Sequence, residues 1–532
     1  MSSSLFMEQV LASKVALGLF FMSAYWFTAG KRRRKLLRQQ SLHYGFPVLC
    51  DDDDEDTIPA MVKEGLIGTR GSGALKQTTP HWDGFFQCLQ NPCDPVNNPH
   101  GHIALCVAEN KLVQEALAKR LMQPGTAYTA FSDSIAYCYN GFLGLPATRE
   151  AVAYFLTRRF LEPTKTRGTS LMHVSPDCIA LGSGCASLLN HLFFSLAEKG
   201  DAVLIPAPYH SAFEYDMQAV AGCVPIPVQM QNPMHGPSPE ELMMAAYAAE
   251  KQGLNVKILL LNNPNDPLGV IYSPTVMRHT IEWARSRDMH VIVDEIYALS
   301  VHQKNNSGFE SVIKLLDNDL GKNVHMIWGL SKDFGASGFR IGMLYTQNEY
   351  LLQALTNLNI FSGVSHPMQL ILADILTDDV FCDAFFEDAR AQLKWSYTTC
   401  AQKLDEMVIP FIAAEAGLCV YVDFSSLLPS QTFEGEEQFA SLVQEYARVV
   451  MSPGQGMRDQ KPGMFRICHA WVASEVLEIA MERLSYLITK IRRYEWEDLD
   501  ANSLNDVLSC GSRNIKRTAS IDLASLTGLY NT

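Results

Sequence analysis

Short apolar runs that alternate with helix-like segments constrain the fold of this chain more than any other feature. The runs occupy residues 177–181, 202–205, 256–261, 290–293 and 324–328. Such runs, bounded by turn residues, are typical of buried strands, and the segments 187–198 and 273–287 have a helical pattern. The alternation predicts an α/β fold, in which helices cover both faces of a mostly parallel sheet.

Candidate ligand-binding residues follow these runs, at the carboxyl end of each expected strand. They are Ser183, Gly184, Cys185, Tyr209, Asp266, Asp294, Tyr297, Ser331 and Lys332. Parallel sheets bind ligands outside the carboxyl ends of their strands, so we expect these residues to meet in one site. An aromatic ring at Tyr209 could stack on a ligand ring, although a packing role is the alternative.

Lys332 lies just after the apolar run 324–328, and Arg340 follows it by eight residues. A lysine at the end of a buried strand is costly unless it is paired or neutralised. A Schiff base with an aldehyde cofactor would neutralise it, and Arg340 could then clamp a phosphate group of that cofactor. The alternative interpretation is a surface turn that carries two solvated cations.

A glycine turn at Ser183 and Gly184 joins the first expected strand to the helix-like segment 187–198. The free N–H groups and positive dipole at a helix N-terminus favour bound anions. By itself, one glycine turn is weak evidence for a phosphate site.

Two further residues stand out. Glu109 lies where a short apolar run meets a turn, and its alternative interpretation is a helix cap. Arg466 lies inside the apolar run 464–469, where an arginine suggests a carboxylate partner.

The segment from Val10 to Gly30 is apolar, with Lys14 as its only charge, and a basic cluster follows at 31–35. About 20 apolar residues span a bilayer, and basic residues stay on the cytoplasmic side. We therefore expect a membrane anchor with the main body of the chain in the cytoplasm. A cleaved targeting segment and a peripheral amphipathic helix are the alternatives.

Composition limits the class of protein. The 532 residues are 47% hydrophobic and 19% charged, which fits a globular enzyme of two or more domains. The net charge of −14 argues against nucleic acid as a main partner. No metal site is expected, because no zinc-ligand spacing is present.

Several motifs occur in one order along the chain. They are Val107-Ala-Glu-Asn, Pro206-x-Pro-Tyr, Asn263-Pro-x-x-Pro-Leu-Gly, Ser331-Lys-Asp-Phe-Gly, Gly338-Phe-Arg-Ile-Gly, Ser452-Pro-Gly and Phe465-Arg. This set resembles the class I/II pyridoxal-phosphate aminotransferase family of fold type I. Within that family it is most similar to the 1-aminocyclopropane-1-carboxylate synthase-like branch. The resemblance covers about residues 91–492.

The resemblance implies the cofactor pyridoxal 5′-phosphate and a role for each candidate. Lys332 would carry the cofactor and move the substrate proton, while Asp294 would pair with the ring nitrogen and Tyr297 with the phenolic oxygen. Tyr209 would stack on the ring. The phosphate would be held by Ser183, Gly184, Cys185 and Arg340, and Ser331 would be a further cofactor-binding residue.

The substrate and the partner subunit are also implied. Arg466 would bind the substrate α-carboxylate, and Glu109 is a further candidate for substrate binding. The resemblance implies a homodimer, in which Tyr139 reaches the phosphate of the neighbouring subunit.

The chain departs from the family pattern at three positions. Gly329 replaces a common phosphate-binding serine. Asp266 replaces the asparagine that contacts the phenolic oxygen, so we expect its carboxyl to be protonated or turned away. Phe142 replaces a tyrosine of the plant synthases, and Tyr139 instead follows the spacing of ordinary aminotransferases.

These observations favour an aminotransferase that acts on an amino acid and a 2-oxo acid. The alternatives are a lyase that closes S-adenosylmethionine to the cyclopropane amino acid, and a non-catalytic relative. The expected segments are an anchor (1–30), a basic and acidic linker (31–81), an N-terminal arm with part of the small domain (82–135), a large cofactor-binding domain (136–352), a small α+β domain (353–495) and a disordered tail (496–532).

Overall fold

The computed structural model describes residues 62–63, 65–68, 71–72, 82–161, 173–303, 308–499, 501–504 and 506–508. The chain divides into a unit that ends at Phe86 and a second unit from Gln87 to Thr532. The expected membrane anchor at 10–30 lies outside the described residues. In the part of the chain that is described, no helix is both long and apolar enough to cross a bilayer.

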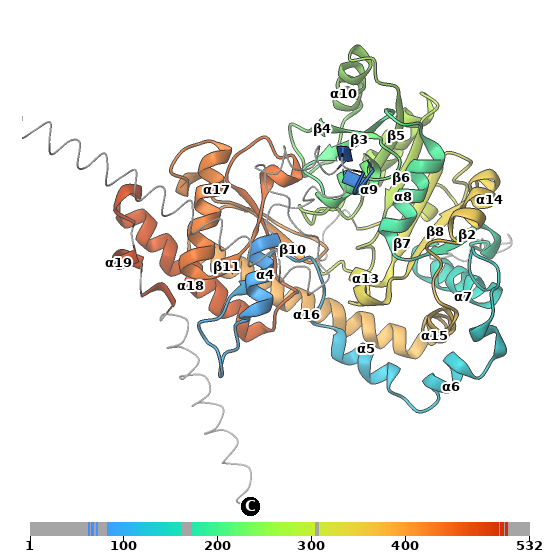
Figure 1. The fold of residues 1–532 in the computed structure, drawn as a ribbon, viewed down its shortest axis with the longest axis horizontal. Coiled ribbons are helices and arrows are strands. Elements are labelled where there is room, and N and C mark those ends of the chain that lie inside the picture. Colours follow the sequence, from blue (N-terminus) through green and yellow to red (C-terminus); the bar gives the residue numbers. More distant parts are fainter. Residues whose placement is uncertain are drawn as a thin grey trace, which may run out of the picture. The chain divides into compact units, whose positions relative to one another are not determined.

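The second unit is built around a seven-stranded sheet (Figure 1). Its strands are β2 (Ile179–Gly182), β3 (Ala202–Ala207), β4 (Val224–Gln229), β5 (Val256–Asn262), β6 (His290–Asp294), β7 (Val324–Gly329) and β8 (Gly342–Thr346). The spatial order is β2-β8-β7-β6-β5-β3-β4. Every neighbouring pair is parallel except the two that involve β8, which is antiparallel to β2 and β7. The predicted mostly parallel sheet is confirmed.

Successive side chains of a strand point to opposite faces of the sheet, which explains why helices cover both faces. On β5, Ile258 and Leu260 point into one core while Leu259 and Leu261 point into the other. All four side chains are completely buried, as expected for a strand between two helical layers.

Each core contains side chains from its own set of helices. The core of Ile258 and Leu260 is called the first core, and the core of Leu259 and Leu261 the second. The first core contains side chains from α8 (Cys185–Leu196), α9 (Ala212–Gln218) and α14 (Glu349–Leu358). The second contains side chains from α5 (Gln114–Leu121), α7 (Pro146–Leu156), α10 (Pro239–Lys251), α11 (Pro274–Arg285), α12 (Val312–Leu315), α13 (Leu330–Asp333), α15 (His366–Leu376) and α16 (Asp379–Glu406).

A smaller antiparallel sheet has the order β12-β13-β10-β9. Its strands are β9 (Phe411–Ile412), β10 (Cys419–Asp423), β12 (Ser452–Pro453) and β13 (Met464–Cys468), and a separate parallel pair joins β1 (Ile103–Ala104) to β11 (Val449–Val450). The core around them includes side chains from α16, α17 (Phe433–Leu442) and α18 (Ser474–Arg493). The remaining described helices are α4 (Trp82–Gln90), α6 (Thr126–Phe131) and α19 (Ala501–Leu504).

Folded structure continues past the predicted start of the tail at residue 496. Leu504 and Val507 are 1% and 0% exposed and belong to the core of the smaller sheet. Two buried apolar side chains therefore tie this segment to α18, whereas the sequence predicts a disordered tail from residue 496.

Candidate active site

A cavity of about 300 Å³ lies at the carboxyl ends of the large-sheet strands. Eight of the predicted site residues line it: Glu109, Cys185, Asp266, Asp294, Tyr297, Ser331, Lys332 and Arg340. Their convergence follows from topology, because parallel strands end at the same edge of a sheet. Ser183, Gly184, Tyr209, Tyr139 and Arg466 do not line it.

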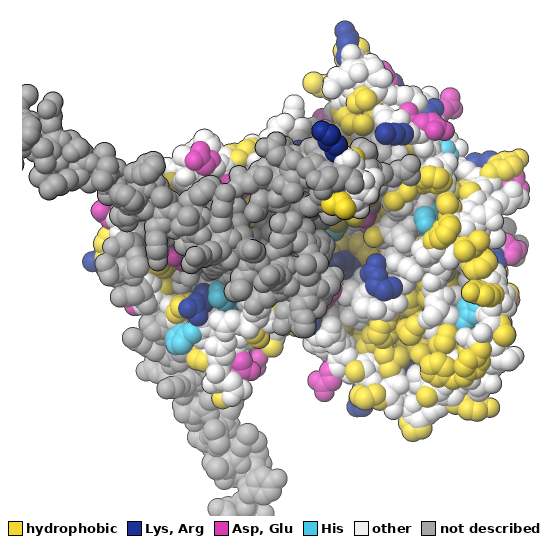
Figure 2. Space-filling view, viewed as in Figure 1, with side chains coloured by type: hydrophobic (Ala, Val, Ile, Leu, Met, Phe, Trp, Pro, Cys, Tyr) yellow, Lys and Arg dark blue, Asp and Glu magenta, His cyan; other side chains and the backbone are white. Residues whose placement is uncertain are grey.

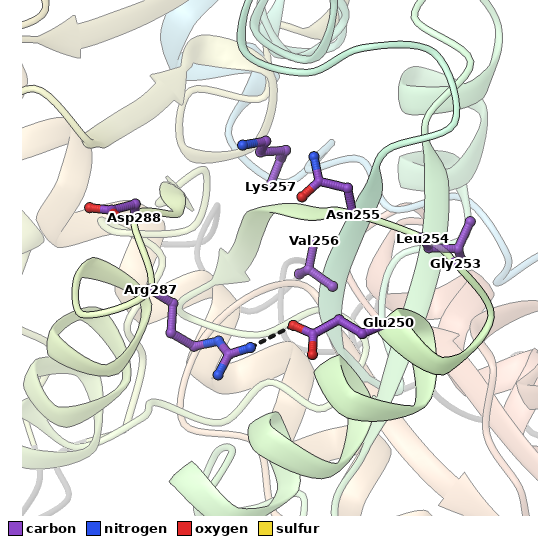
Figure 3. A pocket seen from close by; sticks show the side chains of 8 residues that line it. All are labelled: Glu250, Gly253, Leu254, Asn255, Val256, Lys257, Arg287 and Asp288. Carbon is purple, nitrogen blue, oxygen red and sulfur yellow. Dashed lines mark hydrogen bonds and ion pairs between the residues drawn. The ribbon is translucent and has the colours of Figure 1, made fainter.

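A second hollow, of about 620 Å³, lies near the amino end of β5 (Figure 3). It is an open surface depression, in which the Arg287 guanidinium contacts the Glu250 carboxylate at 2.6 Å. None of the predicted site residues lines it, so its larger volume does not indicate the active site.

Asp294 is the last residue of β6 and is 4% exposed. Burial raises the pKa of its carboxyl to about 7, although the Ile296 N–H and Lys332 oppose this. The Ile296 N–H donates to Asp294 Oδ1 at 3.1 Å. A buried carboxyl of this kind could pair with a protonated ring nitrogen, which would favour its ionised form.

Lys332 lies on α13, the short helix that begins directly after β7. Its Nζ donates to the Ala108 carbonyl and lies in the same cavity as Asp294 and Tyr297. The strand end therefore brings an amine beside a buried carboxyl, as the sequence predicted from the run 324–328.

A candidate anion-binding site is formed by Gly184 and Arg340 where β2 meets α8, and it is called the anion cradle below. Gly184 is the N-cap of α8 and has φ +84°, and a Cβ there would come within 2.7 Å of Arg340 Nη2. Arg340 Nη2 also donates to the Ser183 carbonyl at 3.3 Å. The arginine is thus fixed over a helix N-terminus, where a phosphate is stabilised by both charge and N–H groups.

Ser183 and Cys185 differ within this cradle. The Ser183 N–H and hydroxyl already donate to the carbonyls of Ser362 and Gly363, at 2.8 and 3.3 Å. Cys185 instead faces the cavity. Its side chain also explains the departure at Gly329, because a Cβ at Gly329 would lie 3.0 Å from Cys185 Sγ and 2.7 Å from the Ile341 carbonyl.

Asp266 contradicts one expectation, since it is neither protonated nor turned away from the cavity. Burial would raise the pKa of its carboxyl, but Arg466 and His210 outweigh burial and lower it to about 2. Arg466 Nη1 lies 2.9 Å from Asp266 Oδ1, and the Tyr297 hydroxyl donates to Asp266 Oδ2 at 2.9 Å. Arg466 was expected to have a carboxylate partner, and that partner is Asp266 of the same chain rather than a substrate.

Tyr209 lies outside the cavity and His210 lies in it. The Tyr209 ring is 1% exposed within the core below the site, and its hydroxyl donates to Glu214 at 2.8 Å. His210 and Phe213 are aromatic residues that line the cavity in addition to Tyr297. Burial, with Arg466 and Lys332, lowers the pKa of His210 to about 4, so its ring is neutral near pH 7.

Three further polar residues that the sequence did not single out line the cavity: Asn262, Asp216 and Ser337. Asn262 ends β5, so the strand-end rule could have found it. Asp216 lies on α9, and burial raises the pKa of its carboxyl to about 7. The Ser337 hydroxyl donates to Glu109 at 2.5 Å, which accounts for the position of Glu109.

The fold and this cavity define a class of protein: an enzyme whose half-buried lysine, buried carboxyl and anion cradle could together hold a phosphorylated aldehyde cofactor. A family model described as aminotransferase class I and II matches residues 103–484. The chain belongs to this family, and it is an enzyme that depends on pyridoxal 5′-phosphate.

Curated relatives and solved structures agree with this assignment. The 1-aminocyclopropane-1-carboxylate synthase 8 of Arabidopsis thaliana is 30% identical over 440 residues, which cover 80% of this chain and 91% of the relative. A synthase of Nicotiana tabacum is 29% identical, covering 77% and 84% of the two chains. A single mutant of Thermus thermophilus aspartate aminotransferase has the same fold, with a TM-score of 0.62, 22% identity and coverage of 79% and 99%.

Proposed function

We propose that this enzyme transfers an amino group from an amino compound to an oxo compound. The observation that carries the proposal is the shared cavity of Lys332, Asp294 and Tyr297 beside the Gly184–Arg340 cradle. An amine that lies within reach of both the cofactor and the substrate can hold the first and then act as a base on the second.

Each residue has one task in this proposal. The cofactor supplies an aldehyde and an electron-withdrawing ring. Lys332 would hold it covalently, Arg340 and the start of α8 would bind its phosphate, and Asp294 would keep its ring nitrogen protonated. Lys332 Nζ would also move the proton of the substrate carbon. His210, in place of Tyr209, would pack against the ring.

A cyclopropane-forming lyase is the second candidate, because the relatives compared above are named 1-aminocyclopropane-1-carboxylate synthases. Two sequence features favour transfer: Phe142 takes the place of a tyrosine of the plant synthases, and Tyr139 follows the spacing of ordinary aminotransferases.

Borohydride reduction followed by peptide mapping tests the cofactor site. We expect the label on Lys332, and we expect Lys332→Ala to lose activity by about 10²–10⁴-fold. Lys322→Ala is the matched control, since Lys322 is exposed, where it pairs with Glu349 and lies over the Tyr350 ring. A label on another lysine would contradict the proposal.

The reaction type is tested on one enzyme preparation. S-adenosylmethionine is supplied alone, and then a panel of amines and amino acids is supplied with oxo acceptors. Amino transfer that depends on the acceptor supports the proposal, whereas a cyclopropane product without transfer would establish the lyase.

A further inference from the structure

Arg466, the residue expected to bind a substrate carboxylate, is already engaged within the protein. Its Nη1 donates to Asp266 Oδ1 and Oδ2 at 2.9 and 3.2 Å. Its Nη2 donates to the Cys106 carbonyl at 2.9 Å and to Ser452 Oγ at 3.4 Å. The residue is 4% exposed and does not line the cavity. Both terminal nitrogens of the guanidinium are therefore occupied, and only its buried Nε has no hydrogen-bond partner.

Asp266 occupies the place that a substrate carboxylate would need. It lines the cavity, whereas Arg466 behind it does not. Its carboxyl is ionised at neutral pH, because Arg466 and His210 hold its pKa far below neutrality. An incoming α-carboxylate would meet this negative charge before it reached the arginine, and like charges placed side by side are strongly disfavoured.

The other cations of the cavity do not take the place of Arg466 as a group that could bind a substrate carboxylate. Among the described residues that line it, the basic side chains are Lys332, Arg340 and His210. Lys332 and Arg340 serve the cofactor in the proposed function, and His210 is neutral near pH 7. Glu109 adds a further acidic group on the substrate side.

We propose that this enzyme selects primary amines that lack an α-carboxylate, with an aldehyde or ketone as the acceptor. The inference rests on the proposed amino transfer and names its substrate class. The reaction balances without an external oxidant. The donor carbon exchanges its amino group and one hydrogen for a carbonyl oxygen, and the acceptor carbon undergoes the reverse exchange. Lys332 Nζ carries the proton in both halves.

Matched substrate pairs test this selectivity on the full-length holoenzyme. The pairs are phenylalanine with 2-phenylethylamine and lysine with 1,5-diaminopentane, so the side chain is the same within each pair. We expect the amine to react with the bound cofactor with a kcat/KM about tenfold or more above that of its amino acid. Equal or reversed values would overturn the proposal.

Calorimetry with 3-phenylpropionate provides a readout without turnover, because this compound has the carboxylate and no amine. Wild-type protein should bind it at least about tenfold more weakly than Asp266→Asn does, since the amide frees Arg466. Glu109→Gln is the control for charge alone, and it should gain much less affinity, because it removes one negative charge without freeing Arg466. Tight binding by the wild type, or no gain in Asp266→Asn, would refute the inference.

Failure of the inference can be separated from failure of the proposed function. If no amine or amino acid changes the absorbance of the cofactor, amino transfer is wrong, and the calorimetric comparison still decides whether Asp266 blocks Arg466. If amino acids react as well as amines, amino transfer stands and the substrate class is wrong.

Discussion

Arg340 lies against Gly184 so closely that a Cβ on this glycine would stand 2.7 Å from the arginine Nη2 and 3.0 Å from its Cζ. The two residues are far apart in sequence and belong to different connections of the large sheet. Their contact positions the Arg340 guanidinium at the start of α8. The phosphate site thus depends on the absence of a side chain.

Gly184→Ala should weaken cofactor binding by about tenfold or more, because the new Cβ displaces Arg340. Gly200→Ala is a matched control, since Gly200 also has a positive φ, of +94°, but its Cβ would meet nothing within 4 Å. Both variants should lose about 1–3 kcal/mol of stability from backbone strain. Only Gly184→Ala should lose cofactor affinity, measured by fluorescence titration. Equal affinity in the two variants would contradict this.

Asp294 should make the cofactor-free protein less stable as pH rises. Its carboxyl ordinarily ionises near pH 3.8, whereas burial raises its folded-state pKa to about 7. Between these values the folded state keeps a proton that the unfolded state has lost, so stability falls as pH increases through this window. Asp294→Asn removes the effect.

Thermal unfolding at pH 4 and pH 8 measures this contribution. Relative to wild type, apo Asp294→Asn should gain on the order of a few kcal/mol at pH 8, and little at pH 4, because one pKa unit is about 1.4 kcal/mol. The same variant should bind the cofactor more weakly. A pH-independent difference would show that Asp294 is ionised in the empty site.

The enzyme should be a homodimer that uses the apolar surface around α6 and α15. Phe361, Tyr128, Tyr137 and Tyr139 are 87%, 75%, 73% and 95% exposed. Figure 2 shows hydrophobic side chains gathered at the lower right, where Figure 1 draws these helices. Large exposed apolar patches mark interaction sites.

Sedimentation velocity of a Tyr128→Asp/Phe361→Asp variant tests this surface. We expect a dimer for the wild type and a shift towards monomer for the variant. Tyr247→Asp, on α10 and 58% exposed in the wild type, should leave the dimer intact. Mixing Lys332→Ala with Tyr139→Phe subunits should restore some activity. An active wild-type monomer would refute the prediction.

The N-terminal segment should anchor the chain to a membrane. The run from Val10 to Gly30 is long enough to span a bilayer of about 30 Å. Carbonate extraction should leave the full-length chain in the membrane pellet and release a variant that lacks residues 1–30. Release of both proteins would exclude the anchor.

The large sheet could be predicted because its signal is local. Each strand from β3 to β7 except β4 coincides with an apolar run, and the strand-end rule then places Asp294 and Lys332 at one edge. Neither β4 nor β8 was predicted as a strand, and an apolar run carries no information about which neighbour it pairs with or in which direction.

The Asp266–Arg466 pair could not be predicted in this way, since the two residues are 200 positions apart. Each was noticed separately, Asp266 as a departure from the family and Arg466 as an arginine that needed a carboxylate. Matching the two would have corrected the expected protonation of Asp266. Tyr209 and His210 show a second limit, because neighbouring residues in a loop can face opposite ways and no periodicity determines which one faces the ligand.

The reversal of the chain at β8 limits where this enzyme can tolerate insertions. Because β7 and β8 are antiparallel neighbours, Lys332 and Arg340 reach the same sheet edge through one short connection rather than a helical crossover. Its Gly335 has φ +62° and lies so near the Asn110 carbonyl that a Cβ would come within 2.3 Å of it. Insertions are tolerated in the crossover loops, which can lengthen without moving a strand end. An insertion between Lys332 and Arg340 would move apart the two residues proposed to hold the cofactor, so we expect this connection to keep its length where the crossover loops change theirs.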